Sequence, residues 1–220
     1  MIKRKLKIEA IPNFAVKLYA LVAKKSPCIR DIHQAVAEEV CAKISSGKIL
    51  DIGTGPGYVP LEIAKRAPGL EITGIDLSSG MVKVANKNAE ELGFSNRVKF
   101  KVANAASLPF ENGYFDFVIS TLSLHHWLKP TEYIKEIHRV LKKNGQAYIY
   151  DIWKDTPKEI DEQVRKKYGW FLSFLFLSVV RSHSALTLKE AEEILSSLKV
   201  SFAEKSTQTK GVVLKLQFLK

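Results

Sequence analysis

The stretch KILDIGTGPGY, residues 48–58, constrains the fold more than any other part of the chain. The apolar run from Ile49 to Ile52 is typical of a buried parallel strand, and residues 58–67 carry apolar side chains at helical spacing. The three glycines between them allow a tight turn that a ligand can approach without meeting a Cβ atom. Strand, glycine turn and helix form the first unit of a nucleotide-type βαβ fold, whose free N–H groups favour electron-rich ligand atoms.

The spacing of the glycines separates this loop from the phosphate-binding loops. A dinucleotide loop, G-x-G-x-x-G, needs a glycine where Tyr58 stands, and a P-loop needs Gly-Lys-Ser/Thr before the helix. The loop instead reads Gly53-x-Gly55-x-Gly57, and Asp51 precedes it inside the strand end. The loop alone also fits an ordinary glycine turn in another doubly wound protein.

A second acid stands at the end of the next predicted strand. Asp76 follows the glycine loop by about 20 residues, which is the place that ribose recognition requires. A carboxylate can accept hydrogen bonds from two adjacent hydroxyl groups. The alternative role for Asp76 is to cap the following helix, although Ser78 or Ser79 could also do this.

Together these motifs resemble the class I S-adenosylmethionine-dependent methyltransferases, in the ubiquinone-biosynthesis-like branch that acts on small molecules. The first motif of that family is acid-x-G-x-G-x-G. The resemblance covers residues 47–152 and includes Asp76-x-Ser78-x-x-Met81, Leu108-Pro109-Phe110 and the segment 115–120. It implies an α/β fold with a doubly wound, seven-stranded, mostly parallel sheet that has one antiparallel strand. It also implies S-adenosylmethionine as cofactor and S-adenosylhomocysteine as product.

The resemblance assigns roles to the matching residues. Asp51 would face the methionine ammonium group, Asp76 would hold the ribose hydroxyls, and Leu77 and Met81 would lie beside the adenine. Asn104 stands where the family has an acid, and its amide oxygen can still accept a bond from the adenine amine. The expected cofactor site comprises Asp51, Gly53, Gly55, Gly57, Asp76, Leu77, Met81, Asn104, Ala105 and Ser120.

Three further side chains are candidates for the substrate side. Tyr19 lies where many small methyltransferases carry a tyrosine-containing lid, but packing of its ring on the sheet explains it equally well. His125 and His126 follow the fourth predicted strand, and ligands of open α/β sheets bind outside such strand ends. Either histidine could accept a proton from a substrate, although structural roles under the cofactor or at a short helix are favoured. No metal-ligand cluster is recognisable, and methyl transfer needs no metal.

The chain is predicted to be one domain, residues 1–220. Residues 1–46 form N-terminal helices with a lid, 47–152 the cofactor-binding core, 153–198 a helical insertion and 199–220 a terminal hairpin. In the N-terminal helices Phe14, Leu18, Leu21 and Val22 form one apolar stripe, and Ile32, Val36, Val40 and Ile44 form another. The hairpin is predicted to have strands at 200–204 and 212–218 around a turn at 207–211.

Residues 170–180 are apolar on all sides but too few to span a bilayer. Burial in the core is the first expectation for such a helix. The alternatives are a lid that lines a lipophilic substrate pocket and a surface that touches a membrane.

The amino-acid composition limits the classes of binding partner that the protein could have. The net charge of +11 would suit RNA, an anionic membrane or an acidic substrate, but the lysines are spread along the chain, which favours a solvated surface. No transmembrane run or secretory signal is expected, and two cysteines without a framework fit a reducing cytoplasm.

The sequence therefore predicts in-line methyl transfer from S-adenosylmethionine to a small molecule. One alternative is an RNA or protein methyltransferase, motivated by the charge. Ser120-Thr121-Leu122-Ser123 stands where nucleic-acid amino methyltransferases carry Asn/Asp-Pro-Pro-Tyr/Phe, which disfavours base-amine chemistry. The other alternative is a non-enzymatic, cofactor-binding regulatory subunit. The sequence identifies neither the acceptor nor the oligomeric state.

Overall fold

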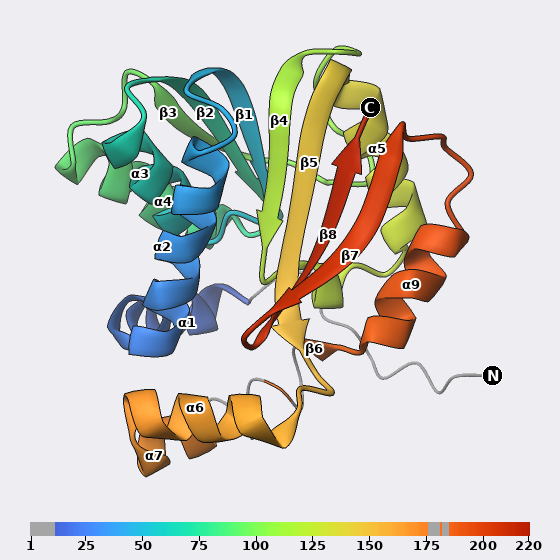
Figure 1. Cartoon of the computed structure of the whole chain (residues 1–220). Helices are drawn as coiled ribbons and strands as arrows, with labels where there is room; N and C mark the ends of the chain where they lie inside the picture. Colours follow the sequence, from blue (N-terminus) through green and yellow to red (C-terminus); the bar gives the residue numbers. More distant parts are fainter. Residues whose placement is uncertain (1–11, 176–180, 182–184) are drawn as a thin grey trace.

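The computed structural model describes residues 12–175, 181 and 185–220, and a twisted sheet runs through its centre (Figure 1). The strand order is β3-β2-β1-β4-β5-β8-β7. β1 to β5 are mutually parallel, and β8 is antiparallel to both of its neighbours. The strands are β1 (Ser46–Ile52), β2 (Gly69–Asp76), β3 (Val98–Val102), β4 (Phe115–Thr121), β5 (Leu141–Trp153), β7 (Glu204–Lys210) and β8 (Val213–Leu219). This confirms the doubly wound, mostly parallel α/β fold, to which the short strand β6 (Ala185–Leu186) adds a pairing with β5.

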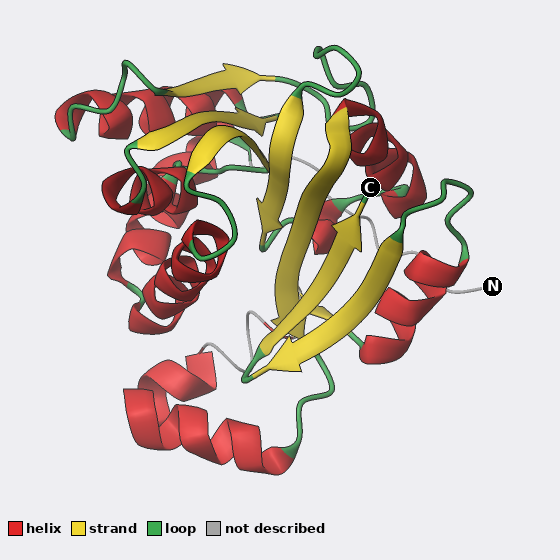
Figure 2. Cartoon of the chain, turned by 45° about the horizontal axis from the view of Figure 1, so that its top comes forward, coloured by secondary structure: helices red, strands yellow, loops and turns green. Residues whose placement is uncertain are grey.

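Helices cover both faces of the sheet (Figure 2). One face packs against α2 (Pro27–Cys41), α3 (Tyr58–Arg66) and α4 (Ser79–Glu91), and the other against α5 (Pro130–Val140) and α9 (Leu188–Ser196). Because side chains alternate along a strand, Ile49 of β1 enters the first core and Leu50 the second. Near the carboxyl ends of the parallel strands lie α1 (Asn13–Lys25), α6 (Lys158–Tyr168) and α7 (Trp170–Leu175) (Figure 1). In the part of the chain that the structure describes, no helix is long and apolar enough to cross a membrane.

The glycine loop between β1 and α3 has the backbone that its sequence predicts. Gly53, Gly55 and Gly57 have φ angles of 71°, 52° and 80°, a region that side chains with a Cβ rarely adopt. A Cβ on Gly57 would lie 2.6 Å from Cζ of Phe100, whereas a Cβ on Gly55 would meet nothing within 4 Å. Gly57 is therefore required for packing against β3, and Gly55 leaves the loop open at the strand ends.

The first apolar stripe of the N-terminal helices faces outward. Phe14, Leu18, Leu21 and Val22 are 89%, 66%, 48% and 50% exposed. The opposite face of α1 is buried and consists of smaller side chains, namely Val16, Ala20 and Ala23. Small side chains let α1 approach α2 and α4 closely, so the large ones remain outside. The second stripe, on α2, is buried as predicted at Ile32, Val36 and Val40.

The expectation of burial for residues 170–180 is wrong for two large side chains. Trp170 and Phe174 are 70% and 55% exposed. α7 packs through Ser173, which is buried and whose hydroxyl donates to the Val164 carbonyl of α6 at 3.0 Å. Contact with α6 therefore shields one side of this six-residue helix. Residues 176–180 lie outside the described residues.

The terminal hairpin is shifted from its predicted place. Its first strand is Glu204–Lys210, so Thr207 pairs with Leu216 inside the ladder and does not begin the turn. β7 is an edge strand of polar residues, and no apolar alternation marks it in the sequence. Phe202, predicted in the strand, precedes it and packs against Phe218, with ring centroids 4.7 Å apart.

Candidate cofactor and active site

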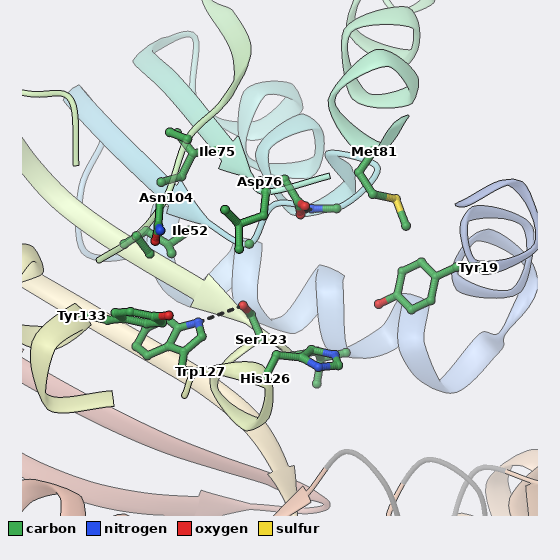
Figure 3. Close-up of a pocket in the computed structure, with 16 residues that line it drawn as sticks. Tyr19, Ile52, Ile75, Asp76, Met81, Asn104, Ser123, His126, Trp127 and Tyr133 are labelled. Carbon is green, nitrogen blue, oxygen red and sulfur yellow. Dashed lines mark hydrogen bonds between the residues drawn. The ribbon is translucent and has the colours of Figure 1, made fainter. Parts of the chain in front are cut away.

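A pocket lies at the carboxyl ends of β1, β2 and β4, bordered by α1 and by the short helix η1 (Leu124–His126) (Figure 3). It brings together seven of the ten predicted cofactor residues, the lid candidate and one of the two histidines. The residues that line it are Tyr19, Ile52, Gly53, Gly55, Ile75, Asp76, Leu77, Met81, Ala103, Asn104, Ala105, Leu122, Ser123, His126, Trp127 and Tyr133.

Asp76 lies at the end of β2 and is held by the backbone. Its Oδ2 accepts a hydrogen bond from the Gly55 N–H at 2.9 Å, and its Oδ1 accepts one from the Ser78 N–H at 2.8 Å. Burial raises the pKa of this carboxyl, and the two backbone N–H groups oppose that shift. Ser78 caps α4, since its hydroxyl accepts from the Met81 N–H. The second lone pair of each Asp76 oxygen remains available, so the carboxylate can accept bonds from two ligand hydroxyls.

Asp51 lies deeper, under the glycine loop. It is 2% exposed, and its Oδ1 makes no hydrogen bond among the described residues. Burial raises the pKa of Asp51 to about 7, and the negative charge of Asp76 adds to the shift. A small adjoining pocket is lined by Asp51, Gly53, Gly55 and Thr121, among others. A buried acid with an unpaired oxygen at a pocket wall suits a cationic ligand group, which would restore its charged form.

The opposite end of the pocket is formed by residues that follow β2 and β3. Met81 is 1% exposed and Leu77 is 37% exposed, and both line the pocket. Asn104 and Ala105 line it from the loop after β3, and Asn104 lies on the side of the pocket opposite Tyr19 (Figure 3). The Asn104 Oδ1 accepts from the Ala106 N–H at 2.8 Å, which closes a local turn and leaves one lone pair on that oxygen.

Three predicted cofactor residues do not line this pocket. Gly57 faces Phe100, and Asp51 reaches only the adjoining one. Ser120 is fully buried, and its hydroxyl donates to the Ile52 carbonyl at 2.9 Å, which ties β4 to β1 beneath the site.

The two histidines of η1 have different surroundings. His126 lines the pocket, whereas the His125 Nδ1 lies 2.9 Å from Oδ1 and 3.0 Å from Oδ2 of Asp151. The backbone N–H of His125 also donates to Asp151, which is completely buried in β5. These contacts with the carboxylate fix the orientation of the His125 ring. The ring centroids of His125 and His126 lie 4.1 Å apart, so the fixed ring of His125 supports the ring of His126 at the pocket.

Asp151 was missed by sequence reasoning. The available signal is an acid at the carboxyl end of an otherwise apolar strand, in Ile149-Tyr150-Asp151-Ile152. Burying a carboxylate is costly unless it is hydrogen-bonded, so such an acid has partners. The partner of Asp151 is His125, 26 positions earlier in the sequence. The pairing of β4 with β5 brings the two residues together.

Tyr19 enters the pocket from α1. Its hydroxyl points into the space between Asp76 and His126, while the side chain as a whole is 39% exposed (Figure 3). Burial of the hydroxyl raises the pKa of Tyr19 to about 12, and the charges of Asp76 and Asp151 add to the shift. The group is therefore a hydrogen-bond donor at neutral pH. α1 is held in place beside it by the Tyr58 hydroxyl, which donates to the Ala20 carbonyl at 3.0 Å.

Ser123 and Trp127 form a wall that the sequence did not indicate. The Trp127 Nε1 donates to the Ser123 Oγ at 3.1 Å, and the Trp127 ring packs edge-on against Tyr133. Ser123 lies so close to the glycine loop that a Cβ on Gly53 would collide with it. Among the described residues no group of three or more His, Cys, Asp or Glu side chains could hold a metal ion.

Comparison with known proteins finds similarity to methyltransferases. A methyltransferase-domain family model matches residues 50–149. The ubiquinone/menaquinone biosynthesis C-methyltransferase of Geotalea uraniireducens is 35% identical over 113 residues, which are 51% of this chain and 47% of the relative. The sterol 4-C-methyltransferase of Caenorhabditis elegans is 30% identical over 66% of this chain and 42% of its own length. The chain spans about half the length of the curated relatives it matches.

A solved structure from Methanococcus maripaludis, described as an S-adenosylmethionine-dependent methyltransferase, has the same fold. Its TM-score is 0.76 at 20% identity, and the match covers 99% of this chain and 96% of the other. The chain therefore shares its fold with an S-adenosylmethionine-dependent methyltransferase, and its residues 50–149 match the methyltransferase-domain family. The sequence relatives that resemble it over about half of its length include ubiquinone/menaquinone biosynthesis C-methyltransferases.

Proposed function

We propose that the protein transfers a methyl group from S-adenosylmethionine to a small molecule and releases S-adenosylhomocysteine. The observation that carries this proposal is the set of three features at the glycine loop, which borders both the main pocket and the small adjoining one. A buried acid with an unpaired oxygen, Asp51, is followed by the open backbone of Gly55 and then by Asp76 with two available lone pairs. The ammonium group, amino-acid backbone and ribose hydroxyls of the cofactor need these partners.

The remaining cofactor residues fit the same placement. Leu77, Met81 and Ala105 supply apolar surface for the adenine ring, and the Asn104 amide supplies a polar contact at its edge. When bound, S-adenosylmethionine supplies a methyl group that its sulfonium already activates. The protein's own contribution is to bind and orient the reactants and to exclude water from them.

On the acceptor side, we assign His126 as the group that accepts a proton where the acceptor carries one. It lines the pocket, and the ring of His125, which Asp151 holds, packs against the ring of His126. The Tyr19 hydroxyl donates a hydrogen bond into the same space and closes it from α1. His125 and Asp151 are therefore positioning residues, and neither lines this pocket.

The proposal treats residues 1–220 as one domain that works in the cytoplasm on a small molecule. Nucleic acid is not favoured as the acceptor, because the basic side chains are spread along the chain. A non-enzymatic, cofactor-binding role would require the same pocket without turnover.

Labelled cofactor tests both the activity and the class of acceptor. The protein is incubated with S-adenosylmethionine that carries a tritiated methyl group and with a cell extract separated into small-molecule, RNA and protein fractions. We expect the label in the small-molecule fraction and none from Asp76→Ala protein. Label transferred to RNA or protein alone, or to no fraction, contradicts the proposal.

A further inference from the structure

The outer face of α1 is an exposed apolar surface made of Phe14, Leu18, Leu21 and Val22. These four side chains recur at helical spacing and are between 48% and 89% exposed. A single exposed apolar side chain is ordinary on a protein surface. Four of them on one face of a 13-residue helix form a continuous patch, which is typical of an interaction surface.

This face is not part of a ligand pocket described for the molecule. None of its four side chains lines the cofactor pocket or the small pocket above Asp51. None lines the cavity of ≈ 630 Å³ between α2, α6 and the sheet either. The outer face of α1 therefore suits an extended partner surface better than a small ligand.

Lysine side chains border the apolar stripe. Lys17 and Lys24 are seven positions apart on α1, so they lie along the same border of the stripe, and Lys25 lies at its carboxyl end. All three are exposed, and none forms an ion pair with another described residue. The sequence of α1 contains no acid. The helix thus combines an apolar face with an uncompensated positive charge.

This combination matches the surface of an anionic phospholipid bilayer. A helix that lies in the plane of such a surface buries its apolar side chains at the acyl boundary and keeps its lysines at the headgroups. The lysines then meet the negative lipid phosphates, which attract them. With 13 residues, α1 presents this pattern over about 20 Å.

A second copy of this chain is a poorer partner for the same face. A symmetric contact through α1 would bring Lys17, Lys24 and Lys25 of one copy against the same lysines of the other. Like charges that face each other oppose association, and each chain carries a net charge of +11. Charge therefore favours an anionic surface.

The position of α1 connects this face with the cofactor pocket. α1 lies near the carboxyl ends of the parallel strands, and Tyr19, on another side of the same helix, enters the pocket (Figures 1 and 3). An α-helix is about 10 Å wide with its side chains. A protein bound through the outer face of α1 would therefore hold the cofactor pocket close to the bilayer.

We propose that the outer face of α1 binds the surface of an anionic phospholipid bilayer. Phe14, Leu18, Leu21 and Val22 enter the acyl boundary, and the lysines of α1 contact the lipid phosphates. The proposal goes beyond methyl transfer and does not rest on it, because these side chains do not line the cofactor pocket.

Co-sedimentation with lipid vesicles tests the proposal. One set of vesicles contains phosphatidylcholine alone, and the other contains equal parts of phosphatidylcholine and phosphatidylglycerol. We expect the full chain to bind the anionic vesicles at least about 10-fold more tightly than the neutral ones. High salt should reduce this difference, because it screens exposed charges.

Two kinds of variant separate the apolar and the charged parts of the face. Phe14→Ser and Leu18→Ser should each weaken binding to anionic vesicles at least about 10-fold, because each removes a large apolar side chain from the acyl boundary. The triple variant Lys17→Gln, Lys24→Gln and Lys25→Gln should weaken it about 100-fold, from about 5-fold for each lysine.

Matched controls change the same residue types near the amino ends of the strands, away from α1. Tyr114→Ser removes an exposed apolar side chain just before β4. The triple variant Lys43→Gln, Lys99→Gln and Lys143→Gln lowers the net charge by the same amount as the triple variant of α1, at exposed positions near the starts of β1, β3 and β5. Both controls should bind anionic vesicles like wild type, and urea unfolding shows that each variant is folded.

Four results would overturn the proposal. They are wild-type protein that does not bind anionic vesicles, a folded Phe14→Ser or Leu18→Ser protein that binds them as tightly as wild type, and equal losses in the two triple lysine variants. The fourth is a wild-type dimer, seen by analytical ultracentrifugation without vesicles, that Leu18→Ser converts to a monomer, since the face would then belong to a second copy.

Discussion

Among the described residues, the cofactor pocket and the cavity between α2, α6 and the sheet are built in different ways. The cofactor pocket is formed by the ends of β1, β2 and β4 and by short loops that follow them, and the loop glycines Gly53 and Gly55 are part of its wall. The cavity under α2 is formed by side chains of two helices and of the flat side of the sheet. Short loops at strand ends leave a recognisable pattern in the sequence, whereas a side-chain cavity between distant elements leaves none.

This difference predicts how each part responds to mutation. At the cofactor pocket, backbone conformation limits what can be substituted, so the effect of a mutation depends on the φ angle and on the nearest neighbour. On α1 and in the insertion, the exposed side of the element tolerates change. The predictions that follow are ordered from the largest expected effect to the smallest.

The two glycines of the loop should differ when each is changed to alanine. Both have positive φ, which costs an alanine about 1–2 kcal/mol, but only the Cβ at Gly57 would meet Phe100, at 2.6 Å. Overpacking adds about 1–3 kcal/mol, so we expect Gly57→Ala to lose about 3 kcal/mol of unfolding free energy and Gly55→Ala about 1 kcal/mol. Urea unfolding measures both values. Equal losses would show that Gly57 does not touch β3 as described.

Cofactor affinity should depend on pH through Asp51. Because the pKa of Asp51 is raised to about 7 in the free protein, the acid is protonated below that pH, and a cationic ligand group must displace the proton. Affinity for S-adenosylhomocysteine should therefore rise nearly 10-fold from pH 5.5 to pH 6.5 and level off above about pH 7.5. Titration calorimetry measures this slope.

The variant Asp51→Asn is the control for the pH dependence of cofactor affinity and should not show it.

The folding stability of the wild-type protein should change with pH in the direction opposite to its cofactor affinity. The folded pKa lies above the unfolded value of about 3.9, so stability from this group is greatest below pH 4 and declines as pH rises toward 7. An affinity in wild type that does not vary with pH would contradict the assignment of Asp51.

At the adenine end, Asn104→Asp should strengthen cofactor binding modestly. A carboxylate is a stronger hydrogen-bond acceptor than an amide, but Asn104 is exposed, so solvent weakens the gain. We expect S-adenosylhomocysteine to bind about 3-fold more tightly, as measured by calorimetry at pH 7.5. Weaker binding in Asn104→Asp would mean that the amide group itself donates to the ligand.

The smallest effect is expected on the outer face of α1. Phe14→Ser and Leu18→Ser remove side chains that are 89% and 66% exposed, so each should change the unfolding free energy by less than about 0.5 kcal/mol. Val16→Ser, on the buried face, is the matched comparison and should cost about 2 kcal/mol or more. A large loss from Leu18→Ser would show that its face of α1 is covered in solution.

The sequence was sufficient wherever local chemistry decides the structure. The glycine loop, the end of β2 at Asp76 and the mostly parallel sheet follow from short motifs whose backbone needs are specific. The partner of His125 did not follow, because Asp151 comes from a different strand. The outward stripe of α1 and the polar edge strand β7 did not follow either, because hydrophobic periodicity locates an element but does not identify its neighbour.

The central claim is that Asp76 holds the two ribose hydroxyls of the cofactor, and calorimetric titration with S-adenosylhomocysteine tests it directly. We predict binding by wild-type protein, at least about 10-fold weaker binding by Asp76→Ala, and wild-type affinity in Asp155→Ala, which removes an exposed acid outside the pocket. Asp76→Asn, which keeps the shape of the side chain, separates loss of binding from loss of folding. Wild-type protein that does not bind, or correctly folded Asp76→Ala protein that binds equally well, would contradict the account.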